Sequence, residues 1–404
     1  MKSKIFNFYR EKLKNGITIL FEKRSTPVIS TAAAIRTGAI NENEKNKGIA
    51  HFVEHMLFKG TKKKNYEVIS REIEKKGGIL NGYTDEERTV FWNKLPSKYL
   101  ITSLENPIQI ISNPAFKEKE FEKEKGVIIE EIKMYKDNPI FYSMDKIKEL
   151  LYGKPFGLSI IGNIPNIQNI KRQELIKFYK NHYSANNIIL SIVGKAEFYD
   201  IKEQLEKIFV KKNIREIIKT KKIKIECINK KQKEKRKGLE QTHLVFGFHT
   251  PLLNDIRRYA YELALTHLTE GMSSVLFNKI REKRGIAYSV KGGINIGKNY
   301  SYATIYVGTR KEKIEEVNKI VIRELKNLKN FKQKDLEETR EQLIGSRRLL
   351  EEDSTEVMNR LLIEEEGFGA EEFYNYESRL QNLKLQDIRN IKIKKLSIFT
   401  LLPE

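Results

Sequence analysis

Three residues of segment 48–58 have side chains that can bind a metal ion and activate water: His51, Glu54 and His55. On a helix, His51 and His55 lie one turn apart on the same face, with Cβ atoms roughly 5–6 Å apart. Two imidazoles at that separation can both reach one zinc ion at about 2.0–2.1 Å. Glu54 projects from nearly the same face, where its carboxylate can accept a proton from water. The order H-x-x-E-H reverses the common zinc signature and predicts a hydrolytic zinc site.

A catalytic zinc site usually has three protein ligands, so the two histidines need a third. The chain has one cysteine, Cys227, which excludes a cysteine-based cluster and leaves a carboxylate as the remaining choice. Segment 117–135 has the periodicity of a long amphipathic helix. Its Glu124 and Glu131 are seven residues apart and therefore lie on one face. Because glutamate is common in this chain, spacing alone does not decide which carboxylate completes the site.

Strand and helix patterns alternate along both halves of the chain. In the first half, strands are predicted at 16–21, 28–35 and 89–92, and helices at 48–58 and 117–135. In the second half, the corresponding predictions are strands at 242–248 and 300–307, and helices at 255–268 and 274–283. Helices that follow strands in this order indicate an α+β fold, with each half forming a mainly antiparallel sheet covered by helices.

Two segments recur in the second half at nearly constant offsets. Residues 73–79 match 280–286 at an offset of 207, and residues 116–122 match 331–337 at an offset of 215. Two matches in the same order indicate duplicated domains of about 200 residues. We therefore predict an N-terminal domain at 1–212, a basic linker at 213–238 and a homologous C-terminal domain at 239–404.

The chain of 404 residues has a formal net charge of +22, which raises the question of nucleic-acid binding. Segment 211–238 contains 13 Lys and Arg residues and 3 Glu residues, so much of the charge is concentrated there. The segment has no aromatic residue that could stack on a base. An exposed linker explains this composition, and we expect no nucleic-acid partner. A nucleic-acid-binding protein that uses this segment is the alternative from another functional class.

Localisation follows from two features that the sequence lacks. No run approaches the roughly 18 apolar residues that a membrane-spanning helix needs, so we expect no membrane partner. The first 16 residues are basic but no continuous apolar segment follows them, unlike a signal peptide. We therefore expect a cytoplasmic protein.

With these motifs in place, the chain resembles the pitrilysin, insulin-degrading enzyme and mitochondrial-processing-peptidase family of inverted zincins, most closely its two-domain bacterial members. The resemblance implies Zn²⁺ as cofactor and Glu131, within Val127-Ile-Ile-Glu-Glu-Ile132, as third ligand beside His51 and His55. It also implies that Glu124 supports the ligands and that Glu54 activates water. The predicted fold then becomes half of a clamshell.

The same resemblance assigns roles to two further segments. In segment 77–84, residues Asn81, Gly82 and Tyr83 would bind the extended substrate along a strand edge, by pairing of backbone groups. The family usually has alanine at the position of Gly82. In the second half, Arg281 and Tyr288 match a signature in which arginine anchors the substrate and tyrosine stabilises the developing oxyanion.

These features lead to one functional prediction and one alternative. The prediction is a zinc metalloendopeptidase that hydrolyses unfolded peptides enclosed in a chamber, with Glu54 as the base. Because the chain carries both signatures, we expect a homodimer in which Arg281 and Tyr288 of one subunit face the zinc of the other. The alternative is a non-catalytic scaffold relative of the same family. The presence of Glu54 favours the enzyme.

Overall fold

The structure is a computed structural model that describes residues 7–210, 225–393 and 395–404. By contacts, the chain divides into two compact units. The first contains 1–132, 159–223 and 350–374, and the second contains 133–158, 224–349 and 375–404. Each unit consists of three separate segments of the chain, whereas the predicted boundaries at 212 and 239 divide the chain into continuous segments. Those boundaries stay a prediction about the two homologous halves.

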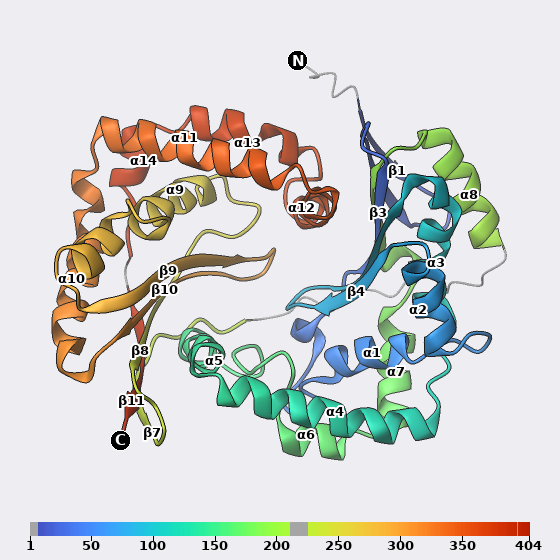
Figure 1. Cartoon of the computed structure of the whole chain (residues 1–404), viewed down its shortest axis with the longest axis horizontal. Coiled ribbons are helices and arrows are strands. Elements are labelled where there is room, and N and C mark those ends of the chain that lie inside the picture. Colours follow the sequence, from blue (N-terminus) through green and yellow to red (C-terminus); the bar gives the residue numbers. More distant parts are fainter. Residues whose placement is uncertain (1–6, 211–224, 394) are drawn as a thin grey trace. The chain divides into compact units, whose positions relative to one another are not determined.

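The first unit contains a six-stranded sheet in the order β1-β2-β6-β3-β5-β4. Its strands are β1 (Phe8–Lys12), β2 (Thr18–Lys23), β3 (Val28–Ile35), β4 (Ile79–Thr84), β5 (Thr89–Pro96) and β6 (Ile188–Gly194). All neighbouring pairs are antiparallel except β2 and β6. β4 is an edge strand, which pairs with β5 alone among the described residues (Figure 1). A mainly antiparallel sheet is thus confirmed.

Helices cover both faces of this sheet, and strand β3 shows how. Thr31 contacts Ser103 of α3 (Leu100–Ser112) through their hydroxyl groups, 2.8 Å apart. The next residue, Ala32, packs instead against α12 (Ser354–Glu366). Successive side chains of a strand point to opposite faces, so burial on both sides explains the continuous small and apolar run of β3. The other helices of this unit are α1 (Ile49–Phe58), α2 (Tyr66–Glu74), α4 (Glu118–Asp137), α6 (Ile164–Asn169), α7 (Arg172–His182) and α8 (Phe198–Val210).

The second unit repeats the same strand arrangement in a five-stranded sheet of order β7-β11-β8-β10-β9. Its strands are β7 (Lys231–Arg236), β8 (Thr242–His249), β9 (Ala287–Ile296), β10 (Ser301–Thr309) and β11 (Ser397–Pro403). The parallel pair β11–β7 corresponds to β6–β2, and the edge strand β9 corresponds to β4. The helices of this unit are α5 (Pro139–Leu151), α9 (Arg258–Thr269), α10 (Ile314–Asn327), α11 (Gln333–Leu350), α13 (Glu372–Gln381) and α14 (Leu385–Arg389).

Part of the predicted linker is a strand. Lys231–Arg236 forms β7, the counterpart of β2, although its composition is almost entirely charged. An edge strand tolerates this composition because charged side chains can remain in water while the backbone pairs on one side. Residues 211–224 of the predicted linker lie outside the described residues.

The two halves of the chain exchange one helix each. Helix α5 comes from the first half and packs on β8 and β11 of the second unit, whereas α12 comes from the second half and packs on β3 and β6. Gly247 of β8 permits the close approach of α5, because a Cβ there would lie 2.7 Å from Ile147. This exchange explains why neither compact unit is one continuous segment.

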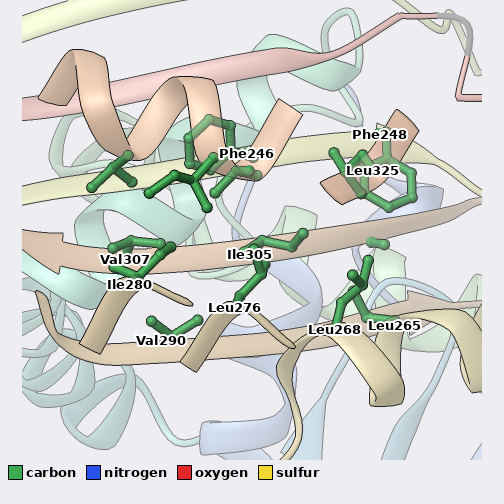
Figure 2. Close-up of a cluster of buried hydrophobic side chains, with 14 of the residues drawn as sticks. Phe246, Phe248, Leu265, Leu268, Leu276, Ile280, Val290, Ile305, Val307 and Leu325 are labelled. Atoms are coloured by element: carbon green, nitrogen blue, oxygen red, sulfur yellow. The ribbon is translucent and has the colours of Figure 1, made fainter. Parts of the chain in front are cut away.

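The core of the second unit lies between its sheet and its helices (Figure 2). Phe246 of β8 and Ile305 of β10 belong to it, as do Leu268 of α9 and Leu325 of α10. The expected helix at 274–283 includes a π-helical segment, η4 (Phe277–Glu282). Within the described ranges, no helix is both long enough and apolar enough to cross a bilayer.

Candidate metal centre

Helix α1 is fixed at its start by buried charges. Gly48 precedes it with φ of 99°, and a Cβ there would lie 2.8 Å from the carbonyl oxygen of Ile161, so glycine is required. The Glu42 carboxylate accepts hydrogen bonds from the backbone N–H groups of Gly48 and Ala50, at 3.2 and 2.8 Å. Lys47 lies 3.2 Å from the same carboxylate, and both side chains are fully buried. This arrangement anchors the turn that carries His51.

The structure brings together His51, His55 and Glu131. The two Nε2 atoms are 3.2 Å apart, and Oε2 of Glu131 lies 3.6 Å from the first and 3.5 Å from the second. Ligand atoms at about 2.0–2.2 Å from a tetrahedral zinc ion are separated by about 3.3–3.5 Å, which these distances match. Oε2 of Glu131 is buried and receives no hydrogen bond from the described residues. A cation fits this set of donor atoms, because it can bind Oε2 of Glu131 together with the Nε2 atoms of His51 and His55.

This cluster also stands out within the described residues. No other group of three His, Cys, Asp or Glu side chains there converges closely enough to hold a metal ion. Burial, reinforced by the nearby charge of His55, lowers the pKa of His51 to about 4. His51 is therefore neutral over the physiological range, which is the form that binds metals.

Glu124 contacts His55 on the side of the ring that faces away from the candidate metal position. Its Oε1 lies 2.9 Å from Nδ1 of His55, and its Oε2 lies 2.8 Å from Nζ of Lys59. Against the opposing effect of burial, the interactions of His55 with the Glu124 and Glu131 carboxylates, which accept from its ring, raise the pKa of His55 to about 9. A cation bound at Nε2 would displace the proton that this ring carries. A carboxylate bonded to Nδ1 fixes the ring so that Nε2 faces the metal position. Lys59, which the sequence analysis did not identify, neutralises and orients this carboxylate.

Glu54 lies beside the cluster but is not part of it. Its side chain is buried, and the hydroxyl group of Thr84 donates a hydrogen bond of 2.7 Å to its Oε2. Burial raises the pKa of the Glu54 carboxyl, which makes it a stronger base than an exposed glutamate. Thr84 is a second residue that sequence reasoning missed. Thr84 is the last residue of segment 77–84, which is predicted to bind substrate, but nothing in its distance along the chain from Glu54 indicates that the two residues meet.

Asn81, Gly82 and Tyr83 all lie on edge strand β4. The Asn81 side chain accepts a hydrogen bond of 2.8 Å from the backbone N–H of Gly82. The Tyr83 hydroxyl donates a hydrogen bond of 3.3 Å to the side chain of Asn359 on α12, so Tyr83 links strand β4 to this helix. A Cβ at Gly82 would lie 2.8 Å from the ring of Phe58. The edge strand is thus packed closely against α1.

Arg281 and Tyr288 contact each other within the second unit. The guanidinium carbon of Arg281 lies 5.2 Å from the centroid of the Tyr288 ring, and Nη1 donates to the Tyr288 backbone carbonyl at 3.2 Å. Tyr288 is 75% exposed at the start of edge strand β9. An exposed phenol held by an arginine can donate a hydrogen bond to a bound molecule.

The second unit retains a counterpart of part of the metal centre. Oγ1 of Thr339 on α11 lies 3.4 Å from Nδ1 of His267 on α9, and the repeat offset of 215 residues places Thr339 at the position of Glu124. Among the described residues, the second unit holds no group of three side chains that could bind a metal ion.

Comparisons with known proteins agree with this architecture. Residues 18–163 match the family described as insulinase (peptidase family M16), and residues 169–343 match the one described as peptidase M16 inactive domain. A Rickettsia bellii protein described as an uncharacterized zinc protease is 34% identical over 86% of this chain and 84% of its own length. The beta subunit of mitochondrial-processing peptidase from Rattus norvegicus is 37% identical over 45% of this chain and 37% of that protein.

Solved structures show the same fold. A protease from Helicobacter pylori superposes with a TM-score of 0.91 and 22% identity, covering 98% of this chain and 99% of that one. A putative M16-like peptidase from Alicyclobacillus acidocaldarius gives a TM-score of 0.85 and 17% identity, covering 98% of both chains.

Two ligands from an H-x-x-E-H helix and a third from a following helix define the inverted zincins. The chain belongs to peptidase family M16, the pitrilysin and insulin-degrading enzyme family, in its two-domain α+β form. Its relatives are named zinc proteases, so zinc and proteolysis are properties of the family.

Proposed function

We propose that this chain is itself an active zinc metalloendopeptidase. The observation that carries the proposal is the convergence of three ligand atoms beside a buried carboxylate that is not a ligand. Burying a carboxylate costs free energy that a single hydrogen bond from Thr84 offsets only in part, and the scaffold alternative gives no reason for a carboxylate at this position.

The residues divide the chemistry between them. Zinc, when bound by His51, His55 and Glu131, polarises the scissile carbonyl and makes water more acidic. Because Thr84 donates to Oε2 of Glu54, Oε1 is the atom that takes the proton from the attacking water. Glu54 then gives this proton to the leaving amine. An extended peptide along the open edge of β4 would pair through backbone groups, which suits substrates without a fixed sequence.

Metal analysis coupled to peptide cleavage tests this proposal. We expect one zinc per chain, with strong loss of zinc in His51→Ala, His55→Ala and Glu131→Gln. Glu130→Gln is the matched control, because Glu130 is an exposed neighbour on the same helix. Glu54→Gln should keep zinc while turnover falls by roughly 10²-fold or more. Full zinc content in all three ligand variants, or normal turnover in Glu54→Gln, would contradict the assignment.

We further propose that the active assembly contains two chains. The matched relative from Rattus norvegicus is by its name one subunit of a peptidase, which is compatible with a partner of a different sequence. This chain carries both the zinc ligands and the Arg281–Tyr288 pair, and that favours a homodimer. In it, Arg281 would hold a substrate carbonyl and Tyr288 would donate to the oxyanion. Cytoplasmic localisation is part of the same proposal.

A further inference from the structure

A groove of about 880 Å³ lies in the second unit, and none of its lining residues belongs to the candidate metal centre. Its walls come from α10, from the start of β7 and from the chain between α14 and β11. Its apolar lining consists entirely of aliphatic side chains: Ile322, Leu325, Ile391, Ile393, Leu396 and Ile398. The volume lies within the range of natural binding sites.

The charge of the groove is uniform. Half of its lining residues are basic and none is acidic: besides Arg389, the basic ones are Lys230, Lys231, Lys326, Lys329, Lys392 and Lys395. Arg389 donates to the backbone carbonyl of Phe331, whereas no carboxylate among the described residues forms an ion pair with the six lysines. An occupant therefore needs apolar groups for the floor and negative charges for the rim.

The duplicated fold indicates what kind of element covers this position. In the first unit, α3 occupies the place that α10 has in the second, between the central strands and the long helix that follows. Helix α8 packs against α3 and buries Ile201, Leu205 and Ile208. The equivalent helix α10 instead lines the groove with Ile322, which is partly exposed, and with the edge of Leu325, which is otherwise buried in the core. In the first unit, an amphipathic helix thus covers the surface that corresponds to the groove.

We propose that the groove binds an amphipathic helix of a partner protein, with an apolar face toward α10 and acidic residues toward the lysine rim. Aliphatic anchors at helical spacing would fill the floor. The absence of aromatic lining residues disfavours nucleic acid, which binds through base stacking.

Two synthetic peptides test the proposal: a 16-residue helix of leucine and glutamate, and its leucine and lysine counterpart with the same apolar pattern. Binding to the full chain carrying Glu54→Gln is measured by fluorescence anisotropy, and mass spectrometry verifies that the peptides remain intact. We expect the glutamate peptide to bind at least about tenfold more tightly than the lysine peptide.

Charge reversal locates the binding. Lys326→Glu with Lys329→Glu leaves five basic and two acidic side chains in the lining, and should therefore reduce the preference for the glutamate peptide. Lys311→Glu with Lys319→Glu, which changes the same charge at exposed positions outside the groove, should leave it unchanged. Ile322→Asp should weaken both peptides, with thermal unfolding as the check on folding.

Several results would overturn the proposal. They are equal affinity for both peptides, equal loss in the two double variants, or no binding. Displacement of the glutamate peptide by dodecanoate, or by an oligothymidylate that binds more tightly than the peptide, would reassign the groove to an acyl anion or to a nucleic acid.

Discussion

Thr84 and Glu54 lie 30 residues apart in the sequence and meet through one hydrogen bond at the candidate metal centre. A donor fixed in this way holds the carboxylate in a single orientation while leaving its second oxygen available. A hydrogen bond to a charged group is worth about 1.5–3 kcal/mol. Without the donor, the carboxylate would lose part of this stabilisation and would no longer be held in one orientation for proton transfer.

We therefore expect Thr84→Val to reduce kcat by about tenfold with little change in KM, because orientation of the base matters most in the transition state. Zinc content should not change, since no ligand is altered. Thr84→Ser keeps the hydroxyl group and should restore most of kcat. Equal losses in the valine and serine variants would show that the packing of Thr84 matters and its hydroxyl group does not.

At the scale of elements, the contact between β4 and α1 determines how close the open edge of β4 lies to His51 and His55. Gly82 has no space for a side chain, because a Cβ would lie 2.8 Å from the Phe58 ring and 2.9 Å from the Val90 carbonyl oxygen. Overpacking of this kind costs about 1–3 kcal/mol. This packing thus explains the glycine at position 82.

Gly82→Ala should lower the free energy of unfolding by about 1–3 kcal/mol and also reduce cleavage. Phe58→Leu in the same chain should recover part of the loss, but not the part caused by the Val90 carbonyl. Gly126→Ala on α4 is the control, because a Cβ there meets no atom within 4 Å. It should leave stability unchanged or raise it. Denaturant unfolding measures all four proteins, and an unaffected Gly82→Ala would contradict the tight packing.

The exchanged helix α12 ends in a buried charge that makes stability depend on pH. Burial raises the pKa of Glu366 to about 7 from 4.5, although Arg88 lies 3.2 Å away. Between these two values the folded chain holds a proton that the unfolded chain has released. Stability contributed by this group is therefore present at low pH and lost as pH rises through 7.

Glu366→Gln mimics the protonated form and should remove this dependence. We expect the free energy of unfolding of the variant, minus that of the wild type, to increase by up to about 3 kcal/mol between pH 5 and pH 8. Glu371→Gln, at an exposed position nearby, should show no such shift. A constant difference for Glu366→Gln across this range would contradict the raised pKa.

At the scale of the whole molecule, the three proposed zinc ligands and the Arg281–Tyr288 pair belong to different compact units. If Tyr288 acts on the zinc of a second chain, Glu54→Gln damages the site of its own chain, whereas Tyr288→Phe damages the site of the partner chain. A mixed dimer then has one site with both defects and one with neither. Each variant alone should lose about 10²–10³-fold in turnover, for Tyr288→Phe because it lacks one oxyanion donor.

Mixing the two variants in equal amounts should restore activity to about one quarter of wild type, since half of the dimers are mixed and each has one intact site. Subunit exchange is verified with a size or affinity tag on one variant. Exchange without recovery would mean that Tyr288 serves the zinc of its own chain or of none.

The sequence by itself determined the parts that depend on local spacing. The i, i+4 relation of His51 and His55 follows from helix geometry, and the repeated segments indicated the two homologous halves. Glu131 required the family resemblance, because a carboxylate 76 residues away is chosen by packing and many glutamates have similar local surroundings.

Only the tertiary structure decided the long-range contacts. The Thr84–Glu54 bond, the Lys59–Glu124 pair and the exchange of α5 and α12 join segments whose local sequences do not specify each other. The basic stretch shows the same limit. Its charge predicted an exposed linker, but Lys231–Arg236 forms a strand because backbone pairing with β11 is independent of side-chain charge. Contacts of this kind depend on which surfaces the whole fold brings together, and spacing along the chain does not encode them.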